Sequence, residues 1–152
     1  MATVLGDEID VLAKAKRAIA SDYVPADDEA YMGEAQLNYY RRLLQEWKKL
    51  ILEASAGTLQ SLQDGPLREP DLNDRASSET DWGIELRTRD RQRKLIAKIE
   101  SALRRIEEGE YGYCEVTGEP IGLGRLSARP IATMTVEAQE AHERREKISR
   151  DD

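Results

Sequence analysis

The chain has 152 residues, the length of one domain, and carries a formal net charge of −7. Charged residues make up 35 % of it and aromatic residues only 5 %, with no Phe, which suits long solvated helices better than a deep globular core. The negative charge argues against free nucleic acid as the main partner, because phosphate binding needs a clustered basic surface. A protein partner is therefore expected, with no sequence-specific DNA binding.

Targeting signals and cysteine usage point to a cytoplasmic protein. No apolar run approaches the roughly 18 residues needed to cross a bilayer, and the N-terminus lacks a basic segment followed by an apolar one. Cys114 is the single cysteine, so an internal disulfide is excluded. Reducing conditions suit such a chain, and we expect no membrane association.

The first half of the chain predicts a short segment followed by a long helix. Residues 1–32 mix a helical stretch, AKAKRAIA, with acidic turn residues, and we assign them to a small globular base. From Gly33, apolar side chains recur at alternating spacings of three and four, as in a coiled-coil seam. This pattern predicts a helix over about 33–62. The seam consists of Leu37, Tyr40, Leu44, Trp47, Ile51 and Ala54.

A loop and a second long helix follow. Residues 63–78, QDGPLREPDLNDRASS, contain two prolines and a glycine, which predict a loop. Ser78 and Asp81 fit a capping box, so the second helix is expected to begin there. Folding back near residue 70 makes the two seams meet, which predicts an antiparallel coiled-coil hairpin over 33–108 with its tip at 63–78. The second seam consists of Ile96, Ile99, Leu103 and Ile106.

Charged residues near the tip have two readings each. The second helix carries a basic stripe, which is either ordinary solvated surface or a docking surface. At the tip, Asp71 and Asp74 could approach a metal ion or a basic loop in a partner's active site. Alternatively, Asp74 could cap the second helix while Asp71 is a solvated turn residue. The basic stripe consists of Arg87, Arg89, Arg91, Arg93 and Lys94.

The last part of the chain has the frame of a zinc ribbon without its ligands. Residues 109–134, here called the ribbon, are rich in glycine and predict short turns and a hairpin. A final helix is expected over 135–152, with either Thr135 or Thr133 as its N-cap. The spacing C-x2-C-x17-C-x2-C is occupied by Cys114, Thr117, Thr135 and Ala138.

These four residues predict no metal site, because tetrahedral zinc requires thiolate, imidazole or carboxylate ligands. We therefore expect no cofactor and interpret Cys114 as a small buried side chain, with His142 on the surface. Apolar burial would then hold the ribbon together. The side chains expected to provide it are Tyr111, Tyr113, Ile121, Leu123, Leu126 and Ile131.

Catalytic motifs are not identifiable in the sequence. No phosphate-binding glycine loop, catalytic triad or paired carboxylates in an apolar setting are found. The fold class is therefore expected to be mostly α, a hairpin on a small base made of the N-terminal segment, the ribbon and the C-terminal helix. A non-enzymatic role is expected.

Three stretches together resemble the DksA/TraR family over about residues 30–149. They are YMGEAQLNYYRRLLQEW, the longer PDLNDRASSETDWGIELRTRDRQRKLIAKIESALRRIEEGEYGYCE, and TGEPIGLGRLSARPIA. The resemblance implies a transcription factor that binds RNA polymerase and inserts its coiled coil into the secondary channel. It also implies that the factor destabilises open promoter complexes together with ppGpp in the stringent response.

The resemblance assigns roles to individual residues. The tip motif of the family, two aspartates followed by an alanine, matches Asp71, Asp74 and Ala76, which favours the functional reading of these acids. Arg91 and Arg125 match positions that face polymerase. The ppGpp positions are matched by Leu95, Lys98 and Arg129, whereas Gln139 replaces a usual lysine.

Two alternatives to a DksA-type regulator remain at this point. A Gre-like transcript-cleavage factor would use tip carboxylates to hold a catalytic metal, but Asp71 and Asp74 are separated by two residues instead of adjacent. A structural coiled-coil adaptor would explain the helices but not the tip. The ribbon is similar to that of family variants which keep the fold without zinc, and we expect the protein to be a monomer.

Overall fold

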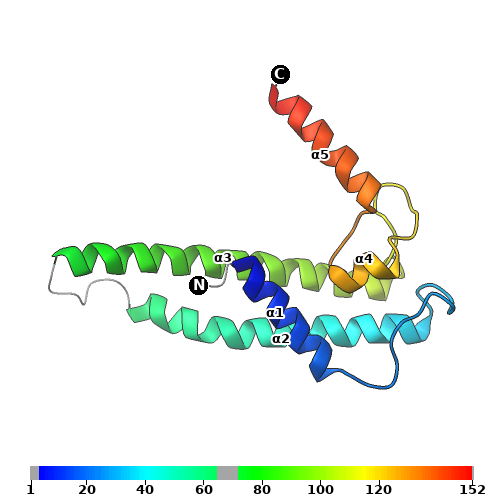
Figure 1. The fold of residues 1–152 in the computed structure, drawn as a ribbon, viewed down its shortest axis with the longest axis horizontal. Coiled ribbons are helices and arrows are strands. Elements are labelled where there is room, and N and C mark those ends of the chain that lie inside the picture. Colours follow the sequence, from blue (N-terminus) through cyan, green and yellow to red (C-terminus); the bar gives the residue numbers. More distant parts are fainter. Residues whose placement is uncertain (1–3, 65–71, 152) are drawn as a thin grey trace. The chain divides into compact units, whose positions relative to one another are not determined.

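A computed structural model describes residues 4–64 and 72–151, and the side chains of residues 10–56 and 79–149. The described chain is almost entirely helical, as expected, and its only extended pairing is an isolated antiparallel bridge between Tyr113 and Pro120 (Figure 1). None of the described helices has an apolar stretch long enough to span a bilayer. The helices are α1 (Val4–Ala18), α2 (Glu34–Asp64), α3 (Leu72–Glu108), α4 (Leu123–Ala128) and α5 (Val136–Asp151).

The chain divides into two compact units, and α2 and α3 each contribute to both. The arm unit comprises Met1–Ala20 and Gln45–Ile99, and the base unit comprises Ser21–Leu44 and Glu100–Asp152. Residues 1–32 were all expected in the base unit, but the structure groups Met1–Ala20 with the arm unit. Helix α1 has an apolar face, and burial of that face against neighbouring helices stabilises the arm unit.

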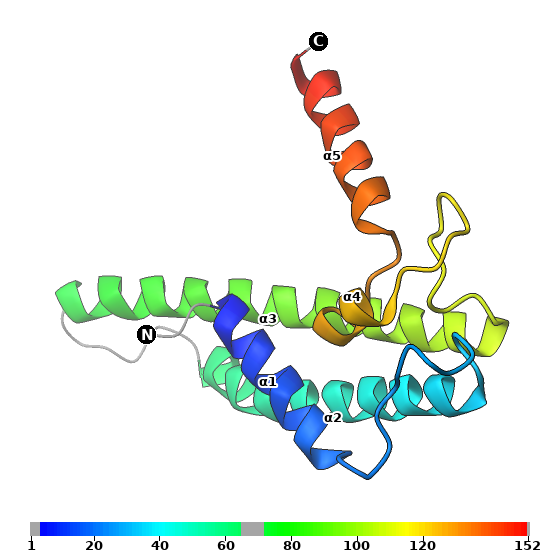
Figure 2. The ribbon, with the colours of Figure 1, turned by 45° about the vertical axis from the view of Figure 1, so that its right-hand side comes forward.

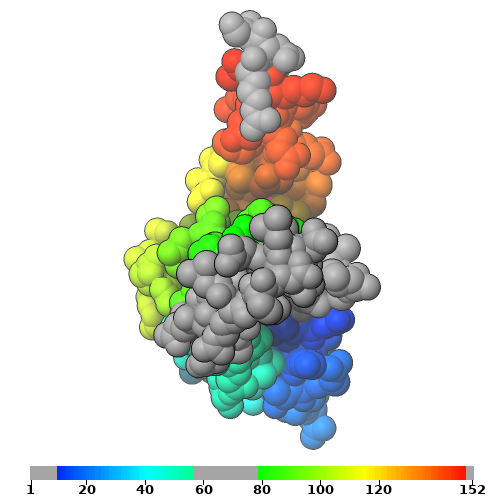
Figure 3. All heavy atoms as spheres, turned by 90° about the vertical axis from the view of Figure 1, so that its left-hand side faces the viewer, coloured from blue at the N-terminus to red at the C-terminus, as the bar shows by residue number. Residues whose placement is uncertain are grey.

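In the arm unit, α1 crosses the paired segments of α2 and α3 (Figures 1 and 2). Among the described side chains, Leu12 and Ala15 of α1 and Ile19, which follows α1, are buried. The space-filling view shows α1 in blue directly against α2 in teal (Figure 3). Between α2 and α3, the Ser55 hydroxyl donates to Gln92 Oε1 at 2.8 Å. The two segments run in opposite directions, as the predicted hairpin requires.

The seams differ from the predicted ones in register. Tyr40, Leu44, Trp47 and Ile51 are buried as expected, but Ala54 is exposed and Leu37 is only partly buried. On α3 the buried positions follow a spacing of four, three and four, so that Ile96 and Leu103 are only partly buried. The observed set is still a heptad, but two of its four positions lie one residue earlier than predicted. The buried α3 residues are Leu95, Ile99, Ala102 and Ile106.

Helix α3 begins at Leu72, six residues before the predicted start at Ser78. The capping box at Ser78 is therefore wrong, and of the predicted tip loop residues 72–78 are helical while 65–71 lie outside the described residues. A helix that has nucleated extends by one hydrogen bond per residue, and serines inside it cost only fractions of a kcal/mol. Asp74 is likewise inside the first turn instead of capping the helix.

The base unit contains one helix that the sequence pattern did not predict. Residues 123–128, expected to form turns, are helix α4, which follows Gly122 in a positive-φ conformation of 101°. The C-terminal helix is confirmed as α5. Of the two expected caps, Thr135 is the one found, because its Oγ1 accepts the backbone N–H of Ala138 at 3.1 Å.

Candidate functional site

Two further positions of the zinc-ribbon frame, Thr117 and Thr135, meet the Cys114 sulfur in the base unit. The thiol is buried, and burial raises its pKa. The hydroxyl and N–H of Thr117 and the N–H groups of Thr135 and Val116 hydrogen-bond to it and outweigh burial, so the pKa falls from 9.0 to about 7. Thr135 in turn caps the turn that holds Ala138. The first knuckle (114–117) therefore meets the second (135–138).

The donor set of this frame does not fit a zinc ion. Threonine hydroxyls and an alanine methyl stand at three of the four positions, and only Cys114 offers a ligand that zinc prefers. Among the described residues, no group of three or more His, Cys, Asp or Glu side chains is placed to hold a metal. His142 is exposed, as predicted, and its Nε2 lies 3.0 Å from Glu146 on the same helix.

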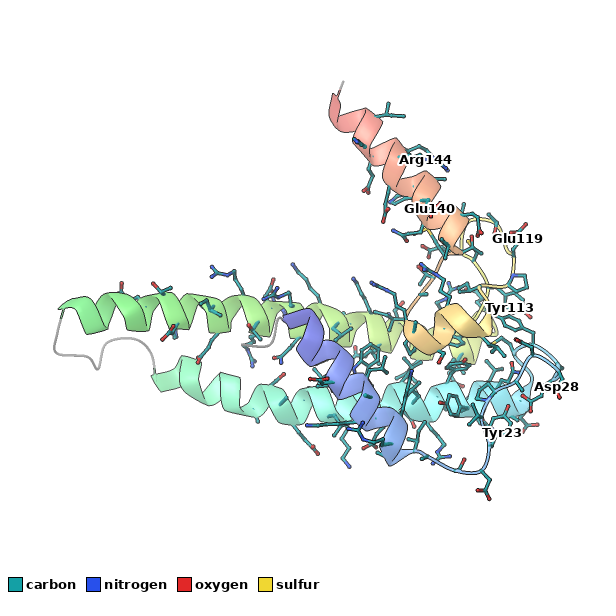
Figure 4. The ribbon with its side chains drawn as sticks, in the orientation of Figure 1. Tyr23, Asp28, Tyr113, Glu119, Glu140 and Arg144 are labelled. Carbon is teal, nitrogen blue, oxygen red and sulfur yellow. The ribbon has the colours of Figure 1, made fainter. Side chains whose placement is uncertain are left out.

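Apolar and aromatic packing surrounds the ribbon. Tyr111 is buried against Tyr40, with ring centroids 5.5 Å apart, and its hydroxyl donates to the Pro130 carbonyl at 2.7 Å. Ile121, Leu126 and Ile131 are buried as predicted. Tyr113 and Leu123 are only partly buried, because both lie at the edge of the ribbon. Figure 4 shows Tyr113 and Glu119 on the loop that follows α3.

Two arginines fix the ribbon backbone. Arg105 Nη2 donates to the carbonyl oxygens of Tyr113 at 2.8 Å and Glu110 at 3.1 Å. Arg125 Nε donates to the Met134 carbonyl at 2.8 Å, and the residue is partly buried. Arg125 therefore holds the segment that leads into α5. Sequence reasoning missed Arg105, since nothing in its spacing signals carbonyl groups beyond the end of its helix.

The predicted effector residues lie in both units. Lys98 is exposed on α3, whereas Leu95, one turn before it, is buried in the seam with 8 % of its surface exposed. In the base unit, Arg129 is exposed at the end of α4. Gln139 is partly buried on α5, and its Nε2 donates to Glu143 Oε1 at 3.0 Å. Beside it, Glu140 and Arg144 project from α5 (Figure 4).

The basic stripe lies on α3 in the arm unit. Asp90 pairs with Arg93 and, at 3.1 Å, with Lys94, and their hydrogen bonds lower the pKa of its carboxyl group. Arg91, in contrast, is exposed. A groove of about 460 Å³ adjoins the stripe. Its lining includes Leu52, Leu86, Arg89, Asp90, Arg93 and Ile96.

The tip residues are described only in part. Asp74 and Ala76 belong to the start of α3, and their side chains are outside the described set. Asp71 lies outside the described residues altogether. An acid in the first turn of a helix is favoured by the helix dipole, so Asp74 is compatible with a helical start.

Known proteins match the chain along most of its length. The family model described as "DnaK suppressor protein DksA, N-terminal domain" matches residues 36–106, and "Prokaryotic dksA/traR C4-type zinc finger" matches residues 109–144. A curated "RNA polymerase-binding transcription factor DksA" from Caulobacter vibrioides is 62 % identical over 132 residues, covering 87 % of this chain and 93 % of the relative. The chain belongs to the DksA family.

Other members of the DksA family are more distant but match a similar extent. The Escherichia coli K12 protein of the same name is 42 % identical over 125 residues, 82 % of this chain and 83 % of that protein. The solved structure of transcription factor DksA2 from Pseudomonas aeruginosa has a TM-score of 0.71 and 39 % identity, and covers 92 % of this chain and 98 % of its own. The sequence resemblance and the helical fold are thereby confirmed.

Within the DksA family, this chain departs from the zinc finger for which the matched model is named. That model is of the C4 type, and its match contains the single cysteine of the chain. The ribbon nevertheless keeps both knuckles in contact through the hydrogen bonds to the Cys114 sulfur. The frame of a metal site is thus retained around one thiol.

Proposed function

We propose that this chain is a transcription regulator that binds RNA polymerase through the secondary channel and destabilises open promoter complexes. The observation that carries the proposal is the 62 % identity, over 93 % of its length, to a relative named as an RNA polymerase-binding transcription factor. The antiparallel pairing of α2 and α3 in each unit supports it, because a slender helical arm can enter a narrow channel. Such a factor works in the cytoplasm, as a monomer, without recognising DNA sequence.

The basic stripe is the proposed docking surface of the arm. Asp90 pairs with both Arg93 and Lys94 and offsets part of their charge. Arg91, which matches a polymerase-facing position of the family, is the stripe residue whose charge we assign to polymerase. It is exposed on α3. We propose that Arg125 contributes to polymerase binding indirectly, because its Nε donates to the Met134 carbonyl oxygen. Docking through a few charges on a net acidic protein makes the association sensitive to salt.

The tip is proposed to act near the polymerase active site through Asp71, Asp74 and Ala76. The two carboxylates are separated by Leu72 and Asn73. A metal-holding pair of the Gre type has adjacent acids, so the separation favours regulation over transcript cleavage. We therefore assign no catalytic role to the chain, in keeping with relatives that are named as transcription factors.

We propose that ppGpp binds at the interface of this factor with polymerase. Lys98 and Arg129 are exposed cations suited to phosphate groups. Leu95 is buried one helical turn before Lys98, and its proposed part is to fix that turn of α3. Gln139 offers hydrogen bonds but no charge, and it must leave Glu143 to reach a ligand. The effector response is therefore expected to be weaker than with a lysine at this position.

Zinc is proposed to be absent from the functional protein. The argument is the donor set, because Thr117, Thr135 and Ala138 supply no thiolate. The packing of Tyr111, Ile121, Leu126 and Ile131 supplies stabilisation that a metal contributes in other ribbons. The protein would then work when zinc is scarce.

The decisive experiment is transcription in vitro from a ribosomal-RNA promoter with purified bacterial polymerase, with and without this chain and ppGpp. Repression that deepens with ppGpp is the expected result. A parallel assay on stalled elongation complexes measures transcript cleavage, which a Gre-type factor would stimulate. No repression together with no binding to polymerase would leave only the adaptor role.

A further inference from the structure

Tyr31 lies just before α2 and contacts the ribbon backbone at two places. Its hydroxyl donates to the Gly112 carbonyl oxygen at 2.6 Å and accepts the Gly122 N–H at 2.9 Å. The two glycines flank the first knuckle, so one hydroxyl joins the beginning and the end of the turn that holds Cys114. The ring of Tyr31 also packs edge-on against Tyr113, with centroids 5.6 Å apart.

The neighbouring residue fills the remaining space at this contact. Gly112 has φ +90°, and a Cβ added to it would lie 2.6 Å from Met32 Cγ and 2.7 Å from Met32 Sδ. Only glycine allows the ribbon backbone to approach this closely. The Tyr31–Met32 pair is therefore fitted to the ribbon at atomic contact.

Residues 21–33, the segment that contains Tyr31, are fixed by hydrogen bonds among themselves and to Gln36. Gln36, with 1 % of its surface exposed, accepts the Met32 N–H at 2.8 Å and donates to the Ala26 carbonyl at 3.2 Å and the Glu29 carboxylate at 3.1 Å. Tyr23 donates to the same carboxylate at 2.8 Å. Because the segment is already ordered, little conformational entropy remains to be lost when Tyr31 engages the ribbon.

We infer that Tyr31 is the positioning residue that closes this ribbon in place of a metal ion. In a C4 ribbon the metal joins the two knuckles through four thiolates, and the fold depends on it. Here the knuckles are joined by the hydrogen bonds at Cys114 and, beside them, by the Glu115 N–H, which donates to the Thr133 carbonyl oxygen at 2.8 Å. Tyr31 ties the first knuckle to the segment that precedes α2. The inference concerns how the ribbon is held and does not depend on polymerase binding.

Removing the hydroxyl has an unequal effect on its two partners. The Gly112 carbonyl also accepts the Ile121 N–H at 2.8 Å, so it stays paired. The Gly122 N–H is left without the Tyr31 oxygen, and an unpaired, partly buried donor is costly. Tyr31→Phe therefore isolates the bridge while the ring contact with Tyr113 is kept.

Amide hydrogen exchange on the full-length chain tests the bridge directly. In Tyr31→Phe, we expect exchange at Gly122 and in the first knuckle to become about tenfold faster, the effect of losing one hydrogen bond. Tyr39→Phe is the matched control, since it removes a tyrosine hydroxyl from the same unit without touching the ribbon bonds, and it should change exchange there less than about twofold. Equal exchange in wild type and Tyr31→Phe would overturn the inference.

A restored metal site provides the second test. Thr117→Cys, Thr135→Cys and Ala138→Cys together rebuild four thiolates around Cys114, and zinc should then bind with a single ion per chain. In that zinc-loaded background Tyr31→Phe should no longer speed exchange in the first knuckle, whereas the Gly122 N–H, which loses its own acceptor, should still exchange faster. If Tyr31→Phe alone fails to fold, rescue by zinc supports the inference. Persistent fast exchange in the first knuckle of Tyr31→Phe, once the rebuilt site is loaded with zinc, refutes it.

Discussion

Leu126→Ala tests whether apolar packing holds the base unit without a metal. Leu126 is the buried residue of α4 and has 0 % of its surface exposed. The substitution removes about three carbon groups at ~0.8 kcal/mol each, and the cavity left behind adds to this loss. We expect a decrease of about 3 to 5 kcal/mol in the free energy of unfolding of the base unit.

Tyrosine and tryptophan signals can follow the unfolding of the two units separately in this chain. All six tyrosines lie in the base unit, and both tryptophans, Trp47 and Trp82, lie in the arm unit. Near-ultraviolet circular dichroism of tyrosine and tryptophan-selective fluorescence are therefore measured during one urea titration. Leu126→Ala should shift the tyrosine transition to lower urea and leave the tryptophan transition closer to that of the wild type.

Val116→Ala is the matched control for this experiment. Val116 lies in the first knuckle with 60 % of its surface exposed, so its truncation should change stability by less than about 0.5 kcal/mol. A loss below about 1 kcal/mol for Leu126→Ala would refute the argument, because it would show that α4 contributes little to the fold of the ribbon. Both titrations are run with a chelator present, so that trace metal does not contribute.

Four further predictions address function, effector, thiol and metal. Asp74→Asn should abolish promoter repression while affinity for polymerase is retained; an equal loss of both would contradict separate roles for tip and arm. A ppGpp titration should show a response that Lys98→Ala removes and Gln139→Lys sharpens, and an unchanged Lys98→Ala response would exclude the site. Because the folded thiol of Cys114 has a pKa lowered from 9.0 to about 7, stability of the base unit should rise between these pH values. Cys114→Ser, mild at lower pH, should abolish that rise, as urea titrations across pH will show. Elemental analysis should find no stoichiometric zinc, and a chelator should leave repression intact; unfolding on chelation is the contrary result.

The sequence was most informative where structure depends on local pattern. Four of the six predicted α2 seam positions are buried, and one of the two expected N-caps, Thr135, is found. Both predictions follow from residue types a few positions apart. The start of α3 was misplaced by six residues, because Ser78 satisfies a capping pattern that the preceding helical turn overrides. Residues 1–20 were placed in the wrong unit, since an amphipathic helix shows that it packs but not against what.

The missing thiolates and the family of the chain were readable from the sequence alone, because ligand chemistry and motif order do not depend on coordinates. Apolar packing in the ribbon was also predicted, but the hydrogen bonds that hold its backbone were shown only by the tertiary structure. Tyr31 meets Gly112 and Gly122 across separations of 81 and 91 residues, and Arg125 turns inward to a carbonyl although its charge predicts a surface. A hydrogen bond between distant residues leaves no periodic trace in the chain, since its geometry exists only after the helices have packed.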